Sequence, residues 1–377
     1  MRKNSLCLIL LMSAVFIASC DKPNVRMHTI IREDGLCERE VSYTTIMSKE
    51  MRDSLWSGNR VSWACPVPEC LNPNAFMGSH TRTEEDTVTT TFRNIFHSVE
   101  EMCLQSPLQL NGARLKSTAK LEKKNRWFYT LYTYTETFTC VGDTFKIPAT
   151  DYADKDVVRY WFTGQPNLLH GLSGAEASEK ISKMESFVTQ WINDNFFKLC
   201  FDFIVNNYDS IQNPPVGKEQ FVELHDSLAN YLLSSMGDIL LVNPNETFEK
   251  FFHSDAYAIF FDGDTPCGKA LEEELSTHMN IFWFSVPYSL TMPGTIVDAG
   301  TGVVKDGVIH YPLTGERLIP QDYTITATSR VTHGWTYIVA VLIFVVFIGS
   351  FLYKGRKRKD KRIKSRFEER VSSKKNE

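Results

Sequence analysis

The sequence lacks the short motifs by which most hydrolases, metalloenzymes and redox proteins are recognised. It has no Gly-x-Ser-x-Gly turn around a serine, no His-Glu-x-x-His pair and no Cys-x-x-Cys pair. It also has no internal repeat and no low-complexity stretch. These absences predict no catalytic residue and no metal site, and they favour a protein that is not an enzyme. A Ser/His/Asp triad assembled from distant positions stays open.

Long apolar runs without a charged residue are scarce as well, and two of them lie near the ends of the chain. Two basic residues precede the first run, 6–18, which suits a signal peptide but is short for a membrane span. It leads into Ile17-Ala-Ser-Cys20, which resembles the bacterial lipobox. We therefore interpret 1–19 as a lipoprotein signal peptide, and the resemblance implies a diacylglycerol on the Cys20 thiol. The alternative is an ordinary secretory signal that contains a cysteine.

The second run, Trp335–Tyr353, has no charged residue and would cover about 28 Å as a helix, close to the thickness of a bilayer core. We predict a transmembrane helix over 334–353, with Trp335 and Tyr337 at one membrane interface and Tyr353 at the other. A buried core helix is the alternative. The basic run that follows favours the membrane span and predicts that the tail, 354–377, is cytoplasmic.

Charge is divided unevenly between the outer part of the chain and this tail. The tail carries twelve Lys/Arg and four Asp/Glu, whereas 21–334 carries 27 basic and 41 acidic residues. An acidic folded part argues against nucleic-acid binding, which needs positive charge on the folded surface. The expected partners are membrane lipids and, as a second class, envelope proteins. We expect no cofactor except the acyl lipid on Cys20.

The expected location is the bacterial cytoplasmic (inner) membrane, with the folded part on its outer, periplasmic side. Asp21 resembles the signal that retains some lipoproteins there. Only Asp21–Asn24 separate the lipid from the first expected strand, a reach of at most about 14 Å. Both ends of the domain are therefore expected to face the membrane, with the first strand running away from it and the last running back.

The outer part is predicted to be an α+β domain with antiparallel β portions from both ends and a helical insertion. In the N-terminal β-rich part, 20–150, one hairpin is expected around Asp34-Gly35 and a second with its turn at 122–125. The insertion, 151–286, opens with a helix that Ser173 and Glu176 would cap. Further helices are expected over 220–234, 247–261 and 269–284, before a C-terminal β part, 287–332.

The chain combines a lipobox, an early hairpin at Asp34-Gly35, a late strand that begins after Met292-Pro293-Gly294, and a membrane helix with a basic tail. In this combination it resembles the LppM-type bacterial lipoproteins. The likeness covers the termini and the β portions, about half of the chain, and the helical insertion departs from it. It implies an envelope-exposed α/β module in contact with lipid, and it supplies no catalytic residue.

Seven cysteines remain after Cys7 and Cys20, so at least one thiol stays unpaired in a monomer. Cys65 and Cys70 form the candidate disulfide, because disulfides are permitted outside the cytoplasm. Asp262-Gly-Asp264 and Asp298–Gly302 are interpreted as turns, because neither has the remaining features of a calcium or phosphate loop. The histidines and the acid of the insertion are interpreted as surface or core residues: His225, His253, His278 and Glu223.

Three functions stay open. The first is a non-catalytic binding or assembly module at the membrane. The second is a lipid- or amphiphile-binding protein, which would use the aromatic residues of the insertion as an apolar groove instead of core. The third is a hydrolase of envelope polymers, which would need a concave cluster of Asp, Glu and His. A type I surface protein of eukaryotic style is the rival topology, with one glycosylation sequon at Asn245-Glu-Thr247.

Overall fold

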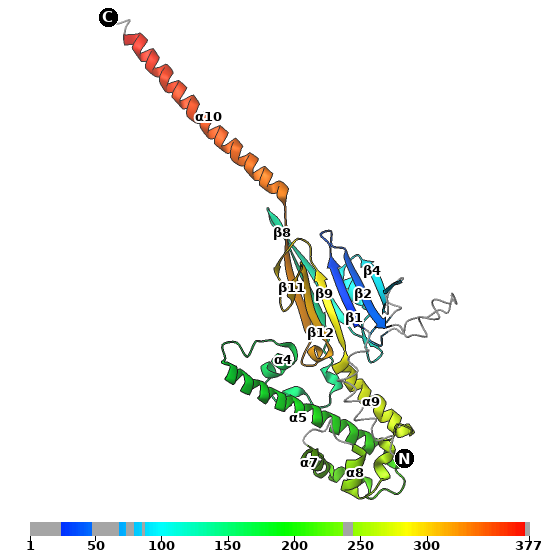
Figure 1. The fold of residues 1–377 in the computed structure, drawn as a ribbon. Helices are drawn as coiled ribbons and strands as arrows, with labels where there is room; N and C mark the ends of the chain where they lie inside the picture. The colour runs from blue at the N-terminus through cyan, green and yellow to red at the C-terminus, as the bar shows by residue number, and fades with distance from the viewer. Residues whose placement is uncertain (1–23, 47–67, 73–78, 85–86, 237–243, 374–377) are drawn as a thin grey trace, which may run out of the picture.

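A computed structural model describes residues 24–46, 68–72, 79–84, 87–236 and 244–373. It is an α+β structure in which two largely antiparallel sheets pack face to face, a helical block covers one end, and a long helix leaves the other end (Figure 1). The predicted fold class is thereby confirmed. How the chain divides into domains stays a prediction.

The larger sheet has the strand order β11-β12-β9-β1-β2-β4-β3, and the smaller one β10-β13-β8-β7. A two-stranded ribbon, β5-β6, lies beside them. The strands are β1 (Asn24–Ile31), β2 (Cys37–Ile46), β3 (Ser79–Glu84), β4 (Thr87–Phe96), β5 (Gln109–Leu110), β6 (Ala113–Arg114), β7 (Ser117–Asn125), β8 (Tyr129–Phe138), β9 (Ser285–Thr291), β10 (Thr295–Asp298), β11 (Val303–Lys305), β12 (Val308–Thr314) and β13 (Tyr323–Thr332).

The two predicted hairpins are present, although one turn lies elsewhere than expected. β1 and β2 pair antiparallel around Asp34-Gly35, where Asp34 accepts from the Leu36 N–H and Gly35 has a φ of 98°. The predicted turn at 122–125 is wrong, because these residues continue β7 and the ladder ends only at Asn125 opposite Thr130. Lys123 is held in the strand by donating to the Glu33 carbonyl at 3.0 Å.

The alternation of buried and half-buried side chains along β8 explains how the two sheets pack together. Every second residue from Thr130 to Phe138 is buried, and these side chains face the larger sheet across one shared core. That core also contains Met27, Val41 and Tyr288 of the larger sheet, each no more than 1% exposed. Burial of one face of each sheet is therefore the main force that holds the β part together.

The helical block lies between β8 and β9 in sequence and packs at one end of the sheets (Figure 1). The capping box at Ser173 and Glu176 is confirmed. The helix predicted over 220–234 is two helices that meet at Leu224, and the one over 247–261 is a helix followed by a 3-10 turn. The helices are α3 (Val99–Leu104, within the β part), α4 (Lys155–Thr163), α5 (Gly174–Asn206), α6 (Lys218–Glu223), α7 (His225–Met236), α8 (Pro244–Phe252), α9 (Pro266–Trp283) and α10 (Gly334–Ser373).

Aromatic side chains of this block form its core. Phe221 is fully buried, with its ring 4.9 Å from that of Phe201 and 5.4 Å from that of Tyr257. Trp191 is also fully buried and donates its Nε1–H to the Ile147 carbonyl. These aromatic residues therefore stabilise the block by packing.

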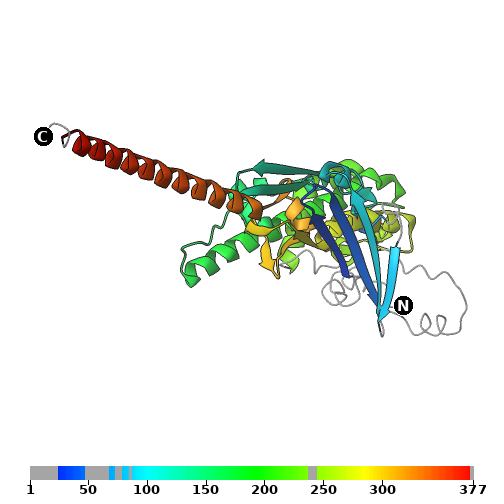
Figure 2. The same cartoon turned by 90° about the horizontal axis from the view of Figure 1, so that it is seen from above.

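The first strand runs in the direction opposite to the predicted one. β1 lies parallel to β9, with Met27 opposite Tyr288. β13 follows Gly315, whose N–H donates to the Phe284 carbonyl just before β9. All three strands thus begin at the helical block and run toward α10, which leaves from the end of β13 (Figures 1 and 2). Asn24 lies at the end opposite to α10, because β1 enters the sheet as the parallel partner of a strand more than 250 residues later.

Candidate functional site

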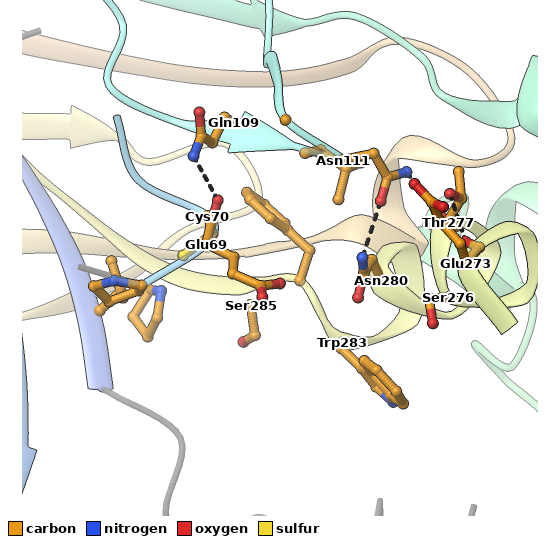
Figure 3. A pocket seen from close by; sticks show the side chains of 16 residues that line it. Glu69, Cys70, Gln109, Asn111, Glu273, Ser276, Thr277, Asn280, Trp283 and Ser285 are labelled. Atoms are coloured by element: carbon orange, nitrogen blue, oxygen red, sulfur yellow. Dashed lines mark hydrogen bonds between the residues drawn. The ribbon is translucent and has the colours of Figure 1, made fainter. Parts of the chain in front are cut away.

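A cleft of about 900 Å³ opens where the helical block meets the larger sheet (Figure 3). Four separate segments form its walls: the start of β1, residues 68–70, the β5–β6 turn, and the continuous run from the end of α9 into β9. The lining side chains are Val25, Pro68, Glu69, Cys70, Gln109, Leu110, Asn111, Glu273, Ser276, Thr277, Asn280, Trp283, Phe284, Ser285 and Pro287.

The wall made by α9 and β9 is formed by an abrupt change from helix to strand. Phe284 ends the helix with extended backbone and donates its N–H to the Asn280 carbonyl. Its own side chain is buried in the core between the sheets. At Phe284 the side-chain repeat changes from about 3.6 residues in the helix to two residues in the strand. Trp283, at the end of the helix, is therefore half-buried and Ser285, at the start of the strand, is exposed, and both line the cleft.

Side-chain amides hold the opposite wall. Asn111 donates to the Thr277 carbonyl at 2.8 Å and accepts from Asn280 at 3.1 Å, which ties the β5–β6 turn to α9 (Figure 3). Gln109 donates to the Glu69 carbonyl at 2.8 Å and thereby fixes the neighbouring segment. The cleft is thus preformed by hydrogen bonds between elements that lie far apart in the sequence.

The lining of the cleft combines apolar and polar surface. Val25, Leu110 and Phe284 contribute apolar surface, whereas amides and hydroxyls lie around them. Its two carboxylates, Glu69 and Glu273, are both exposed and lie on different walls (Figure 3). Among the described residues that line the cleft there is no histidine or aspartate, so the concave acidic cluster of a polymer hydrolase is not found here.

Sequence reasoning missed this cleft, although one local signal for it was present. Asn111-Gly112 has positive φ at both positions, 52° and 71°, and Asn-Gly between two short strands is a hairpin signal. The other walls depend on long-range pairing that no local pattern reveals.

A second polar cluster, also missed, is fully enclosed between the two sheets. Arg39 of β2 donates through Nη2 to Glu136 of β8 at 2.7 Å, and both side chains are at most 1% exposed. Glu136 also accepts from the Tyr134 hydroxyl at 2.6 Å and from the Tyr288 hydroxyl at 2.8 Å. Because the cluster has no route to solvent, it joins the two sheets instead of binding a ligand.

The pKa of Glu136 follows from two opposing influences. Burial alone would raise the pKa of this carboxyl, but the Arg39 charge and the hydrogen bonds from Tyr134, Arg39 and Tyr288 outweigh burial and hold it below its usual range. The pKa values of the Tyr134 and Tyr288 hydroxyls are raised, chiefly by burial, so both remain donors. The cluster is therefore a charged pair solvated by two neutral phenols.

The other predicted residues are placed as follows. Cys20 and Cys65 lie outside the described residues, so the lipid and the disulfide stay predictions, while Cys70 lines the cleft. Trp335, Tyr337 and Tyr353 are exposed on α10. Of the acceptor sequon, Asn245 lies in the first turn of α8 and Thr247 is 2% exposed, a poor setting for glycosylation.

The two segments interpreted as turns, and two of the histidines interpreted as surface or core residues, are confirmed as such. Asp262 accepts from the Asp264 N–H, and Asp298 from the Gly300 N–H, as in ordinary Asx turns. His278 is buried with its two ring nitrogens 3.0 Å from the Glu274 and Thr144 carbonyls. His225 packs its ring against Phe201.

Thiols of the β core are expected to be inert in the folded protein. Burial raises the pKa of Cys37 to about 11 and that of Cys103 to about 12. At pH 8 we expect iodoacetamide to modify both at least about a hundredfold more slowly than an unperturbed thiol, because only the thiolate reacts. Peptide mass mapping of the native chain and of the chain in urea measures this. Modification of the native chain at the denatured rate would show that these thiols are accessible.

No protein-family profile matches the chain, and no curated protein is similar to it at a significant level. Among solved structures, the NMR structure of the folded domain of Mycobacterium tuberculosis LppM is matched over 84% of this chain and 94% of that domain. The identity is 8% and the TM-score 0.25. The chain thus bears a weak structural resemblance to one lipoprotein domain.

Proposed function

We propose that this chain is a bacterial membrane lipoprotein, anchored by a lipid on Cys20 and by α10, whose outer domain is a non-catalytic binding module. Within the part that the structure describes, α10 is the one helix long and apolar enough to cross a membrane. Its apolar stretch has a mean hydropathy of 2.4 and is almost entirely exposed, as shown by Val346 and Phe347 at 70% and 69%. A helix of this kind in water would be costly, which supports the membrane as its environment.

The remainder of α10 supports the proposed orientation. The helix continues beyond Tyr353 to Ser373, and this extension carries the basic residues of the tail. Lys and Arg directly after a membrane span favour the cytoplasmic side, and each contributes about 1 kcal/mol of attraction to anionic headgroups. The outer domain is then on the opposite side of the membrane.

The two proposed anchors together determine how the domain lies. Asn24 is at the start of β1, at the end of the sheets opposite to α10, and the ten residues of β13, which run between those two ends, cover about 33 Å. The residues between Cys20 and Asn24 reach only about 14 Å. If both anchors enter one bilayer, the strands must lie close to the membrane plane, with the domain on its side.

In this orientation the cleft would lie near the bilayer, and our proposal for its ligand depends on that position. Val25, five residues after the proposed lipid, forms part of the cleft wall. A cleft of about 900 Å³ with apolar and hydrogen-bonding surfaces accommodates a molecule that has an acyl part and a polar part. We therefore propose that the module binds an amphiphile from the adjoining membrane.

Filling the cleft tests this proposal. Ser285 is exposed at the cleft and Val304 is 49% exposed on another strand of the same sheet, so Ser285→Trp and Val304→Trp add similar bulk at two surface sites. Native mass spectrometry of the full chain, extracted in detergent, would measure lipid that remains bound. We expect bound lipid in the wild type and in Val304→Trp, and about a tenfold loss in Ser285→Trp, equivalent to about 1.4 kcal/mol.

The same measurement can also contradict the proposal that lipid binds in the cleft. Lipid bound only by α10 would be equal in all three proteins, because none of these changes touches the helix. Equal amounts in Ser285→Trp and the wild type would therefore exclude the cleft as the binding site.

A further inference from the structure

The tip of the β7–β8 hairpin, residues 126–128, lies against the first turn of α10 (Figure 1). The His333 N–H donates to the Phe128 carbonyl at 2.8 Å, and the His333 ring nitrogen Nε2 lies 3.0 Å from the Thr130 hydroxyl. The ring of Phe128 packs on that of Tyr337 with their centroids 5.0 Å apart. Backbone, side-chain and ring contacts thus join the hairpin to the point where the proposed membrane span begins.

This hairpin tip exposes large aromatic side chains that the fold does not need. Trp127 is 61% exposed and Phe128 is 37% exposed, beside Trp335 at 62% and Tyr337 at 51%. An exposed tryptophan at a hairpin tip does not stabilise the core. Exposed apolar side chains that lie together mark sites of contact with another protein or with a membrane. Four aromatic residues from two distant parts of the chain therefore gather around the start of α10.

Basic residues flank these aromatic side chains. Arg126 is exposed at the tip itself, and Lys124 shows 64% of its side chain. Arg330, at the end of β13, lies over the ring of Tyr129 at 5.8 Å. Aromatic rings with Lys and Arg beside them match a membrane–water interface, where rings lie among the headgroups and cations meet phosphates.

We propose that the tip, Arg126–Phe128, inserts into the headgroup region of the leaflet that α10 enters, and forms a membrane contact of the outer domain separate from the two anchors. The occupant of this aromatic surface is the lipid bilayer, because the surface is continuous with the membrane-interface residues of α10. The inference rests on the proposed membrane span. A domain held in this way cannot rotate freely about the β13–α10 junction, because the hairpin tip contacts both the first turn of α10 and the bilayer.

Tryptophan quenching by brominated lipids tests the inference on the full chain. The protein is reconstituted in vesicles of phosphatidylcholine with a minority of phosphatidylglycerol, with and without brominated acyl chains. Trp127→Phe removes the hairpin reporter, Trp335→Phe removes the α10 reporter, and Trp161→Phe, in the helical block, is the matched control. All three changes keep an aromatic ring, and circular dichroism verifies that each variant is folded.

We expect the quenchable part of the emission to fall in Trp127→Phe by about as much as in Trp335→Phe, because both indoles lie at one interface. Trp161→Phe should leave it unchanged. A fall in Trp335→Phe without one in Trp127→Phe would overturn the hairpin contact and leave the membrane span intact. No fall in either would overturn the span and the hairpin contact together.

Discussion

Glu136→Gln is expected to lower the free energy of unfolding by about 3–5 kcal/mol, the largest effect of any single change that we foresee. The substitution keeps the shape of the side chain but leaves the Arg39 guanidinium charged and unpaired at 1% exposure. An isolated charge in a dry core costs far more than the net contribution of the pair. Urea unfolding of the full chain in detergent, followed by tryptophan fluorescence, measures the difference.

The paired replacement is the control for this prediction. Arg39→Met with Glu136→Leu removes both charges and should recover most of the loss, because apolar residues of similar volume replace a buried pair at little cost. The incomplete hydrogen bonding of Arg39 supports this, since Nη1 is buried with no partner among the described residues. A loss for Glu136→Gln of no more than about 0.5 kcal/mol would mean that the pair is solvated in a way the structure does not show.

Acidification should act on the same pair. Because the pKa of Glu136 is lowered in the folded state, its stabilising contribution is present above the unfolded pKa, about 4.3, and is lost as the pH falls through the folded value. The wild type should therefore lose stability below about pH 4 more steeply than Glu136→Gln. Equal slopes for the two proteins would argue against a charged carboxylate at this position.

Removing both proposed anchors should release the protein from the membrane, whereas removing either alone should not. Cys20→Ala abolishes the lipid, and ending the chain at Gly334 removes the apolar part of α10. A diacylglycerol carries two acyl chains, enough for stable attachment, and a transmembrane helix is sufficient by itself. Fractionation of cells should find each single variant in the membrane pellet and most of the combined variant in the soluble fraction.

A soluble Cys20→Ala chain that retains α10 would contradict the membrane span. A soluble truncated chain that retains Cys20 would contradict the lipid. The two outcomes are distinct, so the experiment tests each anchor separately.

Local signals in the sequence were sufficient for several elements. Ser173 and Glu176 cap α5 because the capping box needs only residues three apart. Asp34-Gly35 turns the chain because glycine accepts a positive φ at no steric cost. The apolar run of α10 is long enough to cross a membrane, and its side chains are exposed and not part of a core. In each case, the interactions that decide the structure lie within a few residues.

Long-range interactions account for what the sequence did not predict. β1 pairs with β9 in parallel, and nothing in either strand specifies this partner or its direction. Glu136 is a charged residue within a Thr- and Tyr-rich strand, and only Arg39, 97 residues earlier, explains its burial. The cleft likewise needs four segments that meet only in the folded chain.

The most direct test of the membrane-lipoprotein account is metabolic labelling of the full chain with palmitate, combined with the intact mass of the membrane-extracted protein. We predict a labelled mature chain that begins at Cys20, and complete loss of label in Cys20→Ala while the protein stays in the membrane through α10. An unlabelled wild-type protein would contradict the lipoprotein proposal, leave α10 as the single anchor, and remove the reason for the domain to lie on its side.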